Sequence, residues 1–219
     1  LDIGEPGGST TARLIQLVGV VTLLSIAPGI LVTVTSFTRL VIVFSLLRTA
    51  LGTQQSPPNI VMISLALFLT GFIMAPTLEK AWQDGISPLI EERIDEFEAF
   101  ERAAEPFRVF MLSQVRDKDL QLFEDIGRVG PDEIGANAPL KVLVPAFMIS
   151  ELRRAFEIGF LIYLPFVIID MVVASILMSM GMMMVPPVIV SLPFKLIFFV
   201  LVDGWYLIAG SLVRSFGAS

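Results

Sequence analysis

Three ionisable residues interrupt the apolar C-terminal part of the chain: Asp170 in "FVIIDMVVA", Lys195 in "LPFKLIFF" and Asp203 in "FVLVDGWYL". Charged groups in apolar helices are rare and usually face a partner or a water-filled path. If the flanking apolar runs form a hairpin, Asp170 and Lys195 both lie about 12–17 Å from its tip, at 1.5 Å per residue. We therefore predict an ion pair within the hairpin. A proton or ion relay and pairing with another subunit are the alternatives.

Asp203 lies deeper along the second arm of this hairpin, and Gly204 beside it would permit close approach of another helix. Two aspartates on neighbouring apolar helices also raise the hypothesis of an intramembrane aspartyl protease, whose carboxylates share a proton at close range. Asp170 and Asp203 differ in depth by about 7 Å, which disfavours that dyad.

The chain has no Cys and no His. This composition excludes thiol nucleophiles, Ser-His-Asp triads and His/Cys zinc sites. The net charge is −6 and no basic stripe is present, which argues against nucleic-acid binding. We therefore expect none of these catalytic classes, and we expect no metal and no cofactor.

Half of the chain's ten methionines lie in one stretch, "MSMGMMM" at Met178–Met184. Generic apolar packing is one interpretation, because Met fills irregular gaps. A Cu(I) thioether site is a second, although no Cys, His or other Met cluster accompanies the stretch. The third is an adaptable surface that closes around varied partners. Gly181 and the Pro186-Pro187 pair favour a loop at the hairpin turn, and thus the third interpretation.

The surrounding elements follow from the apolar pattern, since 55% of residues are apolar and the mean hydropathy is +0.81. Apolar runs cover residues 14–34, 60–75, 158–180 and 188–213. We expect a kink at Pro28-Gly29 and an end to the second run at Pro76. The fold class predicted is all-α and membrane-associated, with apolar helical hairpins and a charged helical insert.

The chain is predicted to be one domain, residues 1–219, in three parts: a first apolar helical pair at 14–76, the insert at 77–140 and a second apolar hairpin at 141–219. Most acidic and basic residues lie between Glu79 and Glu157, which marks the insert as exposed to water. Within it, Pro106 is expected to open a helix.

The distribution of Lys and Arg predicts orientation in a membrane. Arg39 and Arg48 are taken to bound the short connection between the first two apolar runs, opposite the acidic insert. The insert and the N-terminus are then extracytoplasmic, and the Met-rich tip points toward the cytoplasm. The start without Met fits a processed N-terminus behind a removed secretory signal, or else a trimmed chain.

Long stretches of the chain resemble the FliP/SctR family. They are "TSFTRLVIVFSLLRTALGTQQSPPN" (Thr35 to Asn59), "FMLSQVRDKDLQLF" (Phe110 to Phe123) and the apolar hairpin from Glu151 to Trp205. The "GTQQ" and "PPN" elements, together with "MGMMM", favour the flagellar branch over the virulence injectisome branch.

The resemblance implies a function and a set of partners. Members of the family are export-gate subunits of type III secretion systems, without catalytic chemistry. Several copies assemble with FliQ-like and FliR-like subunits into a helical ring around a channel. FlhB-like and FlhA-like proteins dock there, and unfolded flagellar polypeptides pass through. The implied location is the bacterial inner membrane in the flagellar basal body, with the insert on the periplasmic side.

The resemblance also assigns residues. Met182, Met183 and Met184 match the family's methionine gasket, with Gly181 as the hinge. Asp170 and Lys195 match its intramembrane charges.

Phe123 and Glu151 lie in segments that resemble subunit contacts of the family.

The rival hypothesis is an ion- or proton-coupled transporter that uses Asp170, Lys195 and Asp203. Such a transporter is expected to show inverted repeats, and no repeat is visible in the sequence.

Overall fold

The computed structural model describes residues 14, 17–19, 21–22, 25, 29–30, 32–53, 55–182 and 184–217. Every regular element in these ranges is helical, which confirms the predicted all-α class. The α-helices are α2 (Phe37–Leu51), α3 (Asn59–Ala81), α4 (Ser87–Ile90), α5 (Glu96–Gln114), α6 (Asp117–Gly127), α7 (Leu140–Ser179), α8 (Pro187–Leu201) and α9 (Gly204–Gly217).

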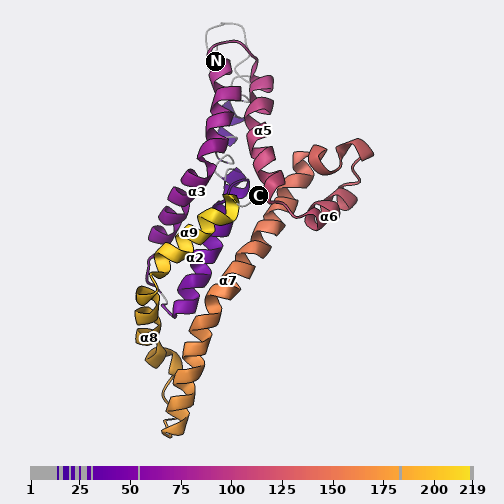
Figure 1. Ribbon diagram of the computed structural model, residues 1–219. Coiled ribbons are helices and arrows are strands. Elements are labelled where there is room, and N and C mark those ends of the chain that lie inside the picture. The colour runs from indigo at the N-terminus through magenta and orange to yellow at the C-terminus, as the bar shows by residue number, and fades with distance from the viewer. Residues whose placement is uncertain are drawn as a thin grey trace.

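Two of the helical segments within the described ranges are long and apolar enough to cross a membrane: Asn59–Ile90 and Leu140–Ser179. The pair formed by α8 and α9 also qualifies by composition, but it is bent by 62°. Figure 1 shows α7 running to the lower end of the molecule, where the chain turns back into α8. Pro28, where the kink was predicted, lies outside the described residues, and the run at 14–34 is described only in part.

Two prolines do not mark the helix boundaries predicted for them. The helix that carries the second apolar run does not stop where the run ends at Pro76, because α3 continues to Ala81 and then through a π-helical turn, Trp82–Ile86. The predicted boundary at residues 76 and 77 therefore falls inside a helix. Pro106 does not open a helix either, since it lies within α5. That helix begins at Glu96, and the side chain of the N-cap residue, Asp95, accepts a hydrogen bond from the Glu98 backbone N–H at 2.8 Å.

The apolar run expected at residues 188–213 is broken in the structure. Asp203 has φ +51°, a left-handed conformation that bends the chain between α8 and α9. Gly204 follows, and a Cβ there would lie 2.2 Å from the Phe199 ring. Gly204 thus accommodates a side chain from α8 rather than the neighbouring helix that was expected.

The core forms around α2. Leu40, Val43, Phe44 and Leu47 follow helical spacing and are fully buried. They pack against α3, α7, α8 and α9 in two adjoining clusters. A third cluster, which includes Met111, joins α5 and α6 to the first part of α7. In Figure 1, α2 and α9 lie beside the middle of α7, whereas α6 projects to one side.

Candidate functional site

The hairpin of α7 and α8 carries the predicted ion pair. Lys195 Nζ lies 2.6 Å from Asp170 Oδ2. Ser191 donates a hydrogen bond to Asp170 Oδ1, and the Lys195 ammonium also donates to the Ala50 carbonyl at 3.2 Å. The pairing within the hairpin is thus present, while the sequence analysis missed Ser191 and the contact with α2. The sequence signal that could have indicated Ser191 is its place four residues before Lys195, which puts both side chains on one face of an apolar helix.

The two partners of this ion pair differ in exposure. The Lys195 side chain is 3% exposed and the Asp170 side chain is 28% exposed. The ammonium is therefore almost completely removed from surrounding solvent, whereas the carboxylate lies at an accessible edge of the hairpin.

The Met-rich tip is built on a helix C-terminus closed by Gly181. The Gly181 backbone has φ +74°, and its N–H donates to Met178 O while the Met182 N–H donates to Leu177 O. This pair of bonds is the Schellman motif, which favours glycine at its left-handed position. Glycine thereby ends α7 and begins the loop that reverses the chain.

The described methionines of the tip point away from the core of the chain. Met184 is 97% exposed, and Met178, Met180 and Met182 are also exposed. Met183 lies outside the described residues. Generic packing within this chain therefore does not account for the cluster. A soft, unbranched apolar surface thus stands free at the end of the hairpin. Figure 1 shows this end of the hairpin at the lower end of the molecule.

A second buried ion pair joins Arg39 of α2 to Glu151 of α7. The side chains are 1% and 0% exposed and make two hydrogen bonds, one of them from Arg39 Nε to Glu151 Oε2 at 2.8 Å. Arg39 also donates to Gln114 Oε1 at 3.1 Å and to Ser215 Oγ at 2.9 Å. Its guanidinium lies 3.7 Å from the centroid of the Phe216 ring. One arginine thus connects α2, α5, α7 and α9.

This position corrects the assignment made for Arg39. It does not bound the connection between the first two apolar runs, because it lies in the first turn of α2 and is buried. Arg48 alone adjoins that connection, where it donates hydrogen bonds to Pro57 O and Asn59 Oδ1. On this side of the apolar region, Arg48 is therefore the residue that still supports the predicted orientation in the membrane.

The remaining predicted residues lie apart from one another. Asp203 is exposed at the bend between α8 and α9, and no side-chain hydrogen bond or ion pair joins it to another described residue. Phe123 packs on the cluster around Met111. The Glu151 side chain is buried within the chain. A contact between its segment and another subunit therefore stays a prediction.

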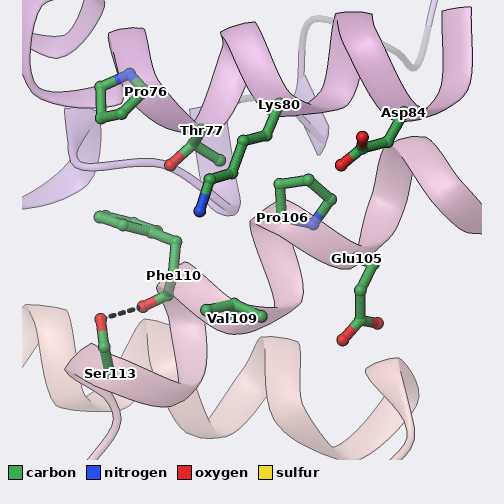
Figure 2. A pocket seen from close by; sticks show the side chains of 9 residues that line it. All are labelled: Pro76, Thr77, Lys80, Asp84, Glu105, Pro106, Val109, Phe110 and Ser113. Carbon is green, nitrogen blue, oxygen red and sulfur yellow. Dashed lines mark hydrogen bonds between the residues drawn. The ribbon is translucent and has the colours of Figure 1, made fainter.

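A cavity of about 660 Å³ lies between α3 and α5 and was not predicted. Figure 2 shows Pro76 and Pro106 on its two walls, with the Lys80 side chain extending between them. Asp84 and Glu105 line the same space. Among the described residues, no group of three or more His, Cys, Asp or Glu side chains could hold a metal ion.

Asp119 anchors α6 to α7. Its carboxylate accepts hydrogen bonds from Ser150 Oγ at 2.6 Å and from Arg116 Nε at 2.7 Å. Burial favours the neutral form and by itself would raise the pKa of Asp119. The bonds from Ser150 and Arg116, with the positive charges of Arg116 and Lys118, outweigh burial and hold that pKa below its ordinary value.

We expect this anchor to stabilise α6 at neutral pH and to fail in acid. Because the folded pKa is lowered, the contribution is present above the ordinary aspartate value of about 3.9 and is lost as the pH falls through the folded value. Hydrogen exchange of α6 amides should show protection that falls below about pH 4 in the unmodified chain. Asp119→Asn should reduce protection at neutral pH and flatten this dependence.

The control for this anchor is Asp125→Asn, an exposed position on the same helix. Equal acid sensitivity in the Asp119 and Asp125 variants would contradict the assignment.

Together, the long apolar helices, the charges paired inside them and the apolar tip define a membrane-embedded, all-helical protein. A profile of the FliP family matches residues 20–212. The chain therefore belongs to the FliP family, as the resemblance predicted.

Several relatives carry the name flagellar biosynthetic protein FliP. The protein of Caulobacter vibrioides is 60% identical over 96% of this chain and 79% of its own length. That of Rhizobium meliloti is 56% identical over 95% of this chain and 86% of its own. That of Bacillus subtilis is 55% identical over 95% of this chain and 93% of its own.

Proposed function

We propose that the chain is a core channel-forming subunit of the flagellar type III protein export gate, through which unfolded flagellar proteins cross the inner membrane. Membership of the FliP family and relatives named as flagellar biosynthetic proteins support a role in the flagellum. The observation that carries the channel role is the exposed methionine surface at the tip of a hairpin whose arms are joined by a buried ion pair.

A methionine gasket suits this task physically. The idle gate must exclude ions and water, and the active gate must pass polypeptides of any sequence. Unbranched apolar side chains can close a constriction by dewetting and then yield without strong specific contacts. In this proposal Gly181 is the hinge, and Met182, Met183 and Met184 from several copies narrow the channel.

The proposed assembly contains several copies of the chain with FliQ-like and FliR-like subunits, and FlhB-like and FlhA-like proteins dock on it. The large exposed apolar surface of α3 and α7 supports burial against lipid or other subunits. The segments of Phe123 and Glu151 are proposed to lie near copy-to-copy contacts. The insert faces the periplasm, and Asp203 and Arg48 remain charges at the edges of the apolar region.

The test replaces Met182, Met183 and Met184 together by Ala in the assembled gate. We expect the ring to form and the idle gate to conduct ions, because smaller side chains leave a constriction wide enough to hold water. Potassium efflux from liposomes containing the purified complex measures the leak, and the mass of the complex measures assembly. An intact ring without added leak is the result that would overturn the gasket.

The same liposomes address the transporter hypothesis. Specific, saturable movement of one small solute by the purified chain alone would favour a transporter that uses Asp170, Lys195 and Asp203. A complex of several copies with small partner subunits, inactive toward such solutes, favours the export gate.

A further inference from the structure

We propose that Ser191 is a positioning residue of the gate: it orients Asp170 so that Lys195 clamps the methionine loop to the C-terminal end of α2. The inference rests on the function proposed above. The group formed by Asp170, Ser191, Lys195 and the Ala50 carbonyl is called the clamp below.

The first element of the clamp is the orientation of the carboxylate. Ser191 is fully buried, and its hydroxyl lies within reach of both Asp170 Oδ1 and its own helix's Val188 carbonyl. A hydroxyl has one proton to donate, and an ionised carboxylate is the stronger acceptor. With Oδ1 bound to Ser191, Oδ2 faces the Lys195 ammonium at 2.6 Å. Ser191 thereby fixes the rotation of the carboxylate, with one oxygen on the hydroxyl and the other on the ammonium.

The second element is the attachment to α2. Lys195 Nζ donates to Ala50 O at 3.2 Å, and Ala50 lies in the last turn of α2. The last four carbonyls of a helix have no partner within the helix, and the partial negative charge there favours a cation. The ammonium is therefore held by a carboxylate from α7 and a carbonyl from α2. One side chain joins three helices.

The third element is packing next to the clamp. A Cβ placed on Gly52, directly after α2, would lie 3.7 Å from Val188 Cγ1 and 3.8 Å from Leu192 Cδ1. Val188, Leu192 and Lys195 share one face of α8. The first turns of α8 therefore rest on the end of α2. Since the methionine loop leads directly into α8, the end of α2 determines where the loop lies.

Loosening the clamp should let α8 and the loop move together. Loss of the Ser191 bond frees Asp170 to rotate, and Lys195 then loses the fixed acceptor that holds it beside Ala50. The methionine surface is intact in such a variant, but its position is less restricted. We therefore expect the idle gate of such a variant to open more often than the gate of the unmodified chain.

The experiment measures potassium efflux from liposomes that contain the whole purified export-gate complex. Ser191→Ala should raise the idle efflux about tenfold. A hydrogen bond to a charged group contributes enough free energy to shift the equilibrium between the closed and the open gate by that factor. Ser191→Cys, which keeps a weak donor, should give a smaller rise and provides a second variant if the alanine protein assembles poorly. The matched control is Ser175→Ala, which changes an exposed serine of α7 whose hydroxyl donates to the Met171 carbonyl.

A double-mutant cycle separates positioning from simple packing. If Ser191 acts through the carboxylate, Ser191→Ala should add no further leak when Asp170 is already Asn. Equal increases in both backgrounds would overturn the clamp, as would unchanged efflux from an assembled Ser191→Ala complex.

The methionine triple variant is the reference for these measurements. A leak in that variant without one in Ser191→Ala rejects the clamp alone. Absence of a leak in the methionine variant itself rejects the proposed gasket.

Discussion

Replacing Glu151 by Gln is expected to destabilise the folded chain by about 3–5 kcal/mol. The substitution leaves the Arg39 guanidinium, which is 1% exposed, without its opposite charge. Removing one partner of a buried ion pair is strongly destabilising, because an uncompensated charge remains in the interior. Replacing both partners by apolar residues costs far less. The midpoint of chemical denaturation in mixed micelles, followed by tryptophan fluorescence, measures the loss.

Glu157→Gln is the matched control for Glu151. It removes the same charge from the same helix, but the Arg153–Glu157 pair is exposed, with side chains 52% and 58% accessible. An exposed pair at this spacing contributes about 0.3–0.5 kcal/mol. Similar costs for the two substitutions would show that the buried pair does not hold the four helices together.

Substitutions in the hairpin ion pair are expected to have unequal effects. Asp170→Asn leaves the nearly inaccessible Lys195 ammonium with only a neutral carbonyl and amide, and should cost about 3–5 kcal/mol. Lys195→Met leaves a carboxylate that is 28% exposed and still bonded to Ser191, so a cost of about 1–3 kcal/mol is expected. The fraction of chain in the assembled complex and the denaturation midpoint both report the difference.

The double variant Asp170→Asn with Lys195→Met tests the cause of this asymmetry. It should be more stable than Asp170→Asn alone, because no unpaired cation remains. A larger loss for Lys195→Met than for Asp170→Asn would contradict the explanation from exposure. The spacing of Asp170 and Lys195 along the hairpin predicts their pairing but does not predict which partner is more exposed.

The predictions that succeeded depended on local patterns. Apolar runs without charge indicated membrane-type helices, and the distance of Asp170 and Lys195 from a Gly- and Pro-marked turn predicted their pairing. Gly181 as the end of the helix followed from its flanking residues. Each of these features depends on neighbours along one helix or one hairpin.

The predictions that failed concerned helix boundaries and long-range partners. Pro76 and Pro106 were read as boundaries, yet each lies within a helix, where packing of α3 against α5 and the core compensates for the missing hydrogen bond. Arg39 was taken to bound the short connection between the first two apolar runs and was counted, with Arg48 and Asp203, among the candidate intramembrane charges. Its partners, Glu151 and Gln114, are too distant in sequence for any local pattern to indicate them.

The sequence by itself determined the helical, membrane-type character of this protein, its family and the hairpin with its methionine turn. The helical character and the turn follow from hydrophobic burial and backbone preference, which act residue by residue, whereas the family follows from the long stretches that resemble it. Only the tertiary structure decided that Arg39 joins four helices, that Lys195 reaches α2 and that Asp203 lies at a bend. Such contacts form when several helices pack at once, because a buried charge takes the partners that the packed helices bring to it.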